Sequence, residues 1–151
     1  AVIISASLLA APVIAEEQTL EFTFTTHTIE EVAMPAPGDM DHSLSVARAA
    51  GTAVFSDGRL ADKQFTYSGD DGSESGAFNR YSINTFQNGD QMRASFTGGW
   101  SSEGVGGDYT VLAGTGAYEG VTGTGRFDAA DNPWEDTSLW SGSFKLTLPD
   151  S

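Results

Sequence analysis

The sequence predicts an all-β fold, and three observations support this prediction. Segments in which apolar and polar residues alternate recur along the chain, as they do in half-buried strands. Short stretches rich in glycine, proline and asparagine separate these segments, and 18 glycines supply the turns. No segment has a convincing helical periodicity. Seven or eight strands in about 130 residues indicate an antiparallel barrel or sandwich, and closing a barrel removes exposed strand edges.

Size and charge limit the possible functions. A chain of 151 residues is expected to form one domain. It carries 21 acidic and 7 basic residues, for a net charge of −14. Such a charge argues against binding nucleic acid or anionic lipid, since both require basic groups. There are no cysteines, which excludes disulfides, thiolate nucleophiles and cysteine-containing metal sites.

Residues 1–15 are uncharged and mostly apolar, and they meet Glu16 and Glu17 abruptly. This pattern is typical of the end of a secretory signal peptide, with cleavage expected after Ala15. The run is too short to span a membrane as a helix. We therefore expect a single domain over residues 16–151, secreted to an extracellular or periplasmic location and not membrane-bound after cleavage. The alternative is that residues 1–15 form an apolar strand or an anchor.

The first half of the chain contains three predicted strand regions. In residues 19–27, Leu20, Phe22 and Phe24 alternate with polar residues, as in a half-buried strand. Residues 34–39 carry two prolines and a glycine and are expected to form a loop. Residues 41–50 fit either a strand or a short helical turn. The remaining expectations are a strand over 51–56, a tight turn at Asp57 and Gly58, and an extended segment over 59–67.

The second half is built around a hairpin and a glycine-rich corner. Residues 78–86 and 91–97 flank an Asn-Gly pair, which is a strong hairpin signal. Residues 109–127 read as strand, turn and strand, and residues 138–148 as the final strand. Polar or acidic loops are expected between these elements, over residues 68–76, 101–107 and 128–136.

The glycine corner predicts a structural role. Its spacing differs from that of the dinucleotide-binding fingerprint, and no helix follows it to bind a phosphate. The glycines instead suit positive φ angles or close backbone approach. We expect an aromatic side chain within the corner to plug one end of the barrel. The residues of this predicted structural corner are Gly114, Gly116, Tyr118, Gly120 and Gly123.

The same corner carries a family resemblance. Residues 111–127, VLAGTGAYEGVTGTGRF, resemble a block of the allene oxide cyclase barrels and the Gly-Gly-Thr-Gly-x-Phe block of the related plant dirigent proteins. The order of segments over residues 19–148 is similar as well. This resemblance implies an eight-stranded antiparallel barrel with an apolar cavity, often assembled as a trimer. It also implies cyclisation or radical-coupling chemistry guided without a cofactor.

The catalytic groups of these families do not carry over. The cyclases' first-strand glutamate falls near Thr25 or Thr26 in this chain. Residues 24–29, FTTHTI, resemble the dirigent Phe-x-x-His-Asp-Ile segment, but Thr28 stands in place of the acid. Ala117 and Thr122 stand where dirigent proteins carry a polar residue and an arginine. No catalytic residue is therefore assigned, and whether the protein is an enzyme is left open.

A set of amphipathic and basic side chains is the candidate ligand-binding lining. Such residues can orient an apolar molecule by a few polar groups, although small barrels also fill their interior with aromatic residues. The candidates are Arg80, Tyr81, Arg93, Trp100, Tyr109 and Trp140.

No metal site is predicted. The acidic loops offer hard oxygen ligands, with Asp70, Asp71 and Glu74 in one and Asp128, Asp131, Glu135 and Asp136 in the other, but neither matches an EF-hand. His27 and His42 lie on different segments without a diagnostic spacing.

Together these features favour a secreted barrel that binds a small hydrophobic molecule or acts as an assembly component, with no cofactor. One alternative is a cofactor-free isomerase or cyclase, as the resemblance implies. Another is a subunit of an extracellular filament or surface layer.

Overall fold

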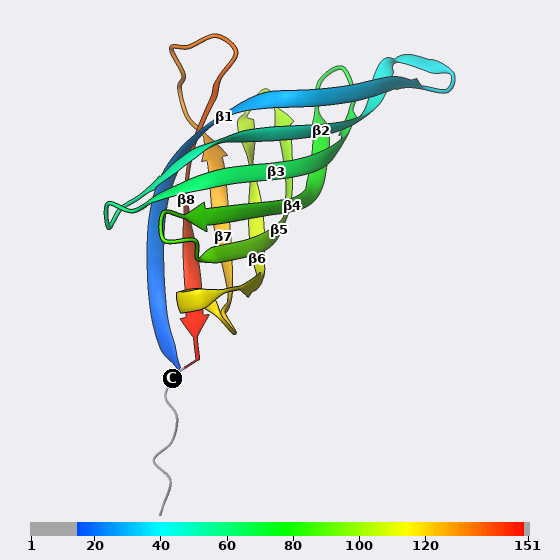
Figure 1. The fold of residues 1–151 in the computed structure, drawn as a ribbon. Helices are drawn as coiled ribbons and strands as arrows, with labels where there is room; N and C mark the ends of the chain where they lie inside the picture. Colours follow the sequence, from blue (N-terminus) through cyan, green and yellow to red (C-terminus); the bar gives the residue numbers. More distant parts are fainter. Residues whose placement is uncertain (1–14, 150–151) are drawn as a thin grey trace, which may run out of the picture.

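The structure is a computed structural model that describes residues 15–149. Eight antiparallel strands follow one another around a closed barrel, each paired with its neighbours in the sequence, and β8 pairs back to β1 (Figure 1). The predicted all-β, eight-stranded antiparallel barrel is therefore confirmed. The elements are β1 (Glu16–Ala36), β2 (Asp39–Phe55), β3 (Leu60–Asp71), β4 (Gly76–Phe86), β5 (Gln91–Ser101), β6 (Gly104–Gly114), the short 3-10 helix η1 (Gly116–Tyr118), β7 (Thr122–Ala129) and β8 (Ser138–Leu148).

The strands are longer than the sequence pattern suggested. Residues 41–50, which fitted either a strand or a helical turn, lie within β2. The predicted loop over 34–39 is wrong, because β1 continues to Ala36 and the turn contains only Pro37 and Gly38. Pro35 is tolerated in β1 because pairing with β8 ends at Thr26, so that the outer edge of β1 needs no N–H donor there.

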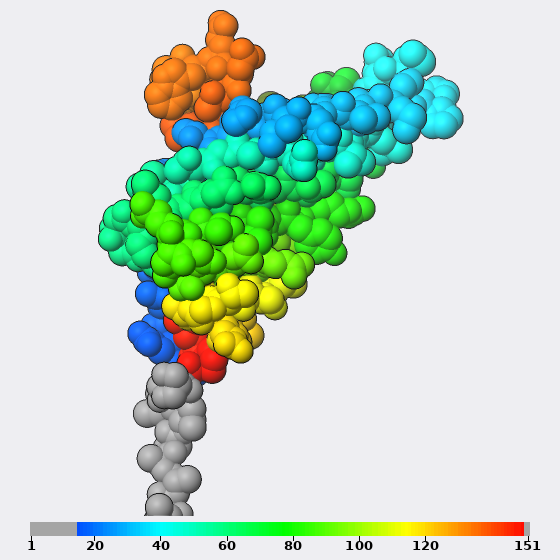
Figure 2. All heavy atoms as spheres, in the orientation of Figure 1, coloured from blue at the N-terminus to red at the C-terminus, as the bar shows by residue number. Residues whose placement is uncertain are grey.

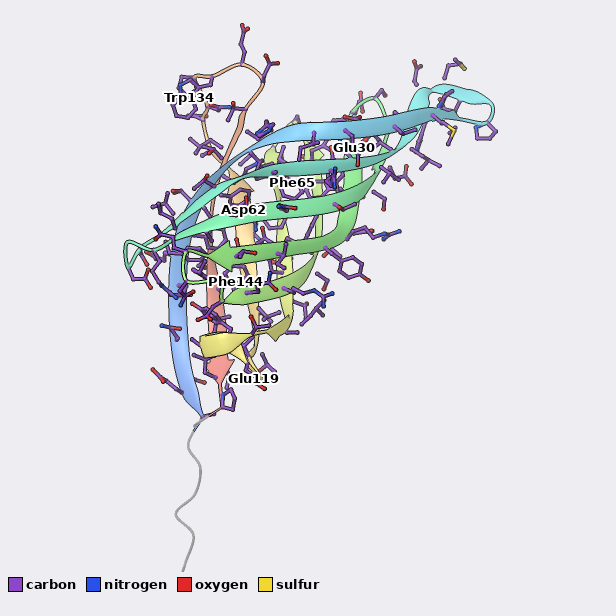
Figure 3. The ribbon with its side chains drawn as sticks, in the orientation of Figure 1. Glu30, Asp62, Phe65, Glu119, Trp134 and Phe144 are labelled. Carbon is purple, nitrogen blue, oxygen red and sulfur yellow. The ribbon has the colours of Figure 1, made fainter. Side chains whose placement is uncertain are left out.

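The acidic and glycine-rich loops are also shorter than predicted. β3 extends to Asp71 and β4 begins at Gly76, while β5 and β6 are separated by two residues only. The sequence pattern assigns these glycines to loops, but they lie within strands. A barrel wall accepts glycine where a neighbouring side chain crosses the backbone. A long connection, residues 130–137, joins β7 to β8 and carries Trp134 (Figure 3).

One end of the barrel is closed by large side chains. Tyr118 of η1 is buried and stacks on Phe86, with ring centroids 5.1 Å apart. Gly116 has a φ of 59°, which glycine adopts without strain. A Cβ at Gly114 would overlap the backbone and the Cβ atom of Tyr118, so only glycine allows this approach. The corner therefore lies across the lower end of the barrel in Figure 1.

The β1–β2 hairpin extends beyond the barrel as an arm. In Figure 2 it projects from the body of the molecule. Its outer face carries Val32 paired with Val46 and Met34 paired with Leu44, each of them at least half exposed. These four residues form a contiguous apolar patch, called here the arm patch, beside the Glu30–Arg48 ion pair.

The predicted signal segment, residues 1–15, lies outside the described residues except for Ala15. The single-domain expectation for residues 16–151 stays a prediction. Within residues 15–149, no helix is long and apolar enough to cross a membrane.

Candidate functional site

The end of the barrel opposite Tyr118 is open and holds a cavity of about 350 Å³. Its wall is mainly aromatic, with small residues and a few polar groups near the mouth. Phe65 of β3, labelled in Figure 3, is one of the lining residues. The lining residues are Phe24, Thr26, Thr28, Ala49, Phe65, Tyr67, Gly69, Asp71, Phe78, Phe96, Trp100, Val105, Tyr109, Phe127, Ser138 and Trp140.

The aromatic rings hold one another in place. Trp140 lies nearly parallel to Phe24, with an interplanar angle of 10° and centroids 5.9 Å apart. Phe127 meets the edge of Trp140 and packs on Tyr109 at 4.8 Å. Mutual packing of this kind adds to burial energy and fixes ring orientation. The cavity therefore has a pre-formed apolar wall rather than loosely placed side chains.

A polar pair sits at the mouth. The indole Nε1 of Trp100 donates a hydrogen bond to Oδ1 of Asp71, at 2.6 Å. Gly76 lies beneath this pair, and a Cβ there would overlap both the indole nitrogen and the carboxylate. A glycine at this position is thus required for the approach of Trp100 to Asp71. Thr28 and Ser138 add hydroxyl groups to the rim.

Deeper in the wall, the Trp140 indole N–H is buried and has no hydrogen-bond partner among the described residues. An unpaired buried donor costs free energy. Nε1 is covered by neighbouring atoms, so a molecule in the cavity gains this hydrogen bond when the indole turns toward it. Nearby, burial raises the pKa of the Tyr67 and Tyr109 hydroxyls above the ordinary tyrosine value. The cavity thus offers hydrogen-bond donors in an apolar setting.

A lysine lies behind the cavity wall. Lys63 of β3 is 1% exposed, and its Nζ lies 4.7 Å from the ring centroid of Phe24 and 5.0 Å from that of Tyr109. Nζ has no hydrogen-bond partner among residues 15–149. Burial alone lowers the pKa of this amine from its ordinary value of 10.5 to about 7. Phe24 and Tyr109 both line the cavity, so the amine is separated from it by these two rings.

The sequence-predicted lining residues divide into two groups. Trp100, Tyr109 and Trp140 come together on the cavity wall. Arg80, Tyr81 and Arg93 are exposed and outside it. Strand alternation explains Tyr81 and Arg93, because their buried neighbours along the strands already face the interior.

Arg80 differs from the other two, since it has the parity of the inward-facing residues of β4. Its φ is 152°, which is unusual for a residue other than glycine, and its side chain is exposed.

Sequence reasoning missed Asp71 and Lys63 as site residues. The sequence pattern places Asp71 in an acidic loop. In the structure Asp71 belongs to β3 and pairs with Gly76 of β4, which places its carboxylate at the mouth of the cavity. Lys63 could have been found from strand alternation, because it takes the inward position of β3 between Ala61 and Phe65. A lysine on the apolar face of a strand is unusual and marks a position worth examination.

The positions singled out by the resemblance are also placed. Thr26 and Thr28 line the cavity, whereas Thr25, the other position aligned with the cyclases' glutamate, does not. Ala117 and Thr122 belong to the closed end. Glu21 and Glu30 are exposed. Among the described residues, Asp71 is the carboxylate of the lining, and the lining contains no arginine.

The acidic loops and histidines do not assemble into a metal site within residues 15–149, where no cluster of three or more potential ligands is found. His42 instead pairs with Asp70, and this hydrogen bond raises the pKa of the imidazole.

Comparison with known proteins supports the fold. No protein-family model matches the chain. No curated protein matches it either. The similar solved structures include two pterocarpan synthase dirigent proteins. GePTS1 has a TM-score of 0.64 and 14% identity, over 99% of this chain and 100% of that one. PsPTS1 has a TM-score of 0.57 and 13% identity, over 90% of this chain and 97% of that one. The dirigent-like barrel predicted from the glycine corner is thereby confirmed as a fold.

Proposed function

We propose that this barrel binds a small, mostly aromatic molecule that carries an oxygen acceptor, in the cavity at its open end. The observation that carries this proposal is the unpartnered indole N–H of Trp140 in an aromatic wall. An apolar pocket with a few placed polar groups is the usual form of a small-molecule site. A volume of about 350 Å³ suits a ligand of one or two fused rings.

Binding is favoured over turnover because of what the lining contains. Related barrels that act on substrates are expected to place acids on the first strand, and here Thr26 and Thr28 occupy that wall. Asp71 is already bound to Trp100 at the rim. These features support a role in holding or orienting a molecule rather than in transferring protons to it.

A fluorescence titration tests this function. The probe is 6-propionyl-2-dimethylaminonaphthalene, a neutral two-ring ketone whose emission shifts to the blue in apolar surroundings. We expect saturable binding by the wild-type protein. Trp140→Phe retains an aromatic ring but removes the N–H donor, and a neutral hydrogen bond contributes about 0.5–1.5 kcal/mol, so affinity should fall about 2- to 13-fold.

Trp134→Phe is the matched control, because Trp134 is exposed on the 130–137 connection and does not line the cavity. This variant should bind the probe as the wild type does. Equal affinities for all three proteins would contradict the role of Trp140, and the absence of saturable binding would contradict the cavity as a ligand site.

A second candidate role, assembly with further copies of the chain, is favoured by the arm patch. Val32, Met34, Leu44 and Val46 gather exposed apolar surface on one face, and monomeric proteins seldom leave such patches uncovered. The neighbouring Glu30 and Arg48 offer both charges, so the surface is suited to pair with itself. We propose that copies of the chain form a homo-oligomer through the arm. We also propose that the chain is exported, and the apolar run of residues 1–15 supports this second proposal.

A further inference from the structure

We propose that Lys63 is a covalent attachment site, whose amine forms an imine with an aldehyde held in the cavity. The proposal rests on the proposed function, because the aldehyde must first occupy the cavity. It extends that function by naming the ligand chemistry as a small aromatic aldehyde.

Cation–π contacts with three rings offset only part of the cost of burying the Lys63 ammonium. The amine faces the rings of Phe22, Phe24 and Tyr109, with no carboxylate or carbonyl oxygen as a hydrogen-bond partner among residues 15–149. Buried ammonium groups are normally paired, and an unpaired one is destabilising. An apolar residue of similar size would fill this space at a lower cost, so the amine itself calls for a chemical explanation.

Two further polar groups lie beside it. Asn84 is directly opposite Lys63 on β4, and its Oδ1 is buried without a partner. The hydroxyl of Ser82, one inward position along β4, is likewise buried and unpartnered. Three orphaned polar groups on adjacent strands form a polar spot inside an otherwise aromatic barrel. A ligand oxygen would accept hydrogen bonds from the Lys63 amine and the Ser82 hydroxyl, whereas Asn84 Oδ1 is an acceptor and needs a donor, such as the water that imine formation releases.

The geometry connects this spot with the cavity. Phe24 and Tyr109 separate Nζ from the cavity, and both rings contact the amine and line the cavity. Lys63 is followed on the inward face of β3 by Phe65, which also lines the cavity. The proposal therefore includes a change of the Lys63 rotamer toward Phe65, for which the side chain has a flexible four-carbon stem.

The chemistry is balanced without a co-reactant. A lysine amine desolvated in an apolar pocket is available in its neutral, nucleophilic form, and the pKa of about 7 is consistent with this. The nitrogen lone pair attacks the carbonyl carbon, and the carbon–oxygen π electrons move to the oxygen. Both amine hydrogens leave with that oxygen as water, and the carbon–nitrogen double bond forms. Hydrolysis reverses the reaction, so attachment is reversible.

Reductive trapping tests the proposal. The full chain is incubated at pH 7 with benzaldehyde and sodium cyanoborohydride, which fixes an imine as a benzyl amine, and the modified peptide is identified by mass spectrometry. The chain supplies an internal control, because Lys63 and Lys145 are its two lysines and Lys145 is exposed on β8. We expect Lys63 to be labelled at least 10-fold faster than Lys145, and an excess of benzyl alcohol to slow the labelling of Lys63 only.

Labelling of Lys145 alone, or of both lysines at equal rates, would overturn the proposal. The titration with the naphthyl ketone separates this failure from that of the proposed function: probe binding without labelling of Lys63 removes the imine and leaves the cavity as a ligand site. In Lys63→Met the label that benzyl alcohol slows should be absent, and the slow label at Lys145 should remain. Since the assignment of the label comes from the wild-type peptide, it does not depend on that variant folding.

Discussion

Replacement of Lys63 by methionine should stabilise the protein, and the gain should decrease as the pH rises. Methionine is flexible and similar in length, so it can occupy the space between Phe24 and Tyr109 with little repacking. The substitution removes an amine that is fully buried and has no hydrogen-bond partner among residues 15–149. The expected effect therefore has the opposite sign to that of most core substitutions, which destabilise.

The magnitude follows from the pKa of Lys63. Burial lowers this pKa from 10.5 to about 7, so between these values the unfolded chain binds more protons than the folded one, and stability rises with pH. Below pH 7 the penalty is fully present. One proton corresponds to about 1.4 kcal/mol per pH unit, which gives roughly 2 kcal/mol between pH 7 and pH 9 after partial titration at the limits. At pH 7 the pKa difference corresponds to about 4 kcal/mol, and a repacking cost of about 1 kcal/mol around methionine leaves an expected gain of about 3 kcal/mol.

Other titrating groups define the range of the experiment. Tyr109 also faces Lys63, and burial raises the pKa of its hydroxyl. The contribution of Tyr109 to the free energy of unfolding is fully present below the ordinary tyrosine pKa near 10 and is lost as the pH rises above it. The measurements therefore end at pH 9, where this contribution does not change. The pKa of His42 is raised, and its contribution is lost as the pH rises from 6.5 through the folded value. Both proteins share this effect, so it cancels in the difference.

The assay is urea unfolding of wild type, Lys63→Met and Lys145→Met at pH 7, 8 and 9. Lys145 is exposed, so its replacement should leave the slope of stability against pH unchanged. The difference between wild type and Lys63→Met should shrink by about 2 kcal/mol over this range. A difference that is constant with pH would refute the reasoning, because it would mean that Lys63 stays protonated in the folded protein.

Two further predictions concern the closed end and the arm. Tyr118→Ala should lower the free energy of unfolding by about 3–5 kcal/mol, because it removes a buried ring stacked on Phe86 and leaves a void; urea unfolding measures this, and Tyr118→Phe, which retains the ring, should cost much less. Val46→Glu should dissociate the proposed homo-oligomer in native mass spectrometry, whereas Thr110→Glu on the exposed face of β6 should not; a wild-type monomer would contradict assembly through the arm.

The fold was largely predictable because its signals are local. Alternation in β1 placed Phe22 and Phe24 on the inner face, and the glycines around Tyr118 pointed to a plugged barrel end, where Tyr118 is indeed buried. Strand ends were less predictable. Pro35 reads as a loop residue, but it is compatible with β1 because the arm lies beyond the last pairing with β8.

The site was less predictable, because it depends on which strands face each other across the barrel. The sequence nominated Trp100 and Trp140 for their amphipathic side chains but not the carboxylate that binds Trp100. Asp71 and Trp100 are 29 residues apart, and their contact depends on register and on the small size of Gly76. Such long-range contacts leave no periodic signal within one strand. Lys63 is the exception, since its place on the apolar face was visible in the sequence.

The distribution of side-chain size along the barrel explains why a cavity forms at one end only. At the closed end, Phe55, Phe86 and Met92 face inward and meet Tyr118, so the interior is filled. Toward the mouth, Ala49 and Gly69 take inward positions on β2 and β3, and their missing volume is not replaced. Lys63 lies between these two regions, and its Nζ contacts the rings of Phe24 and Tyr109. A residue that is destabilising when buried therefore lies where the filled end meets the open one, and the proposed imine requires its amine to reach the cavity from there.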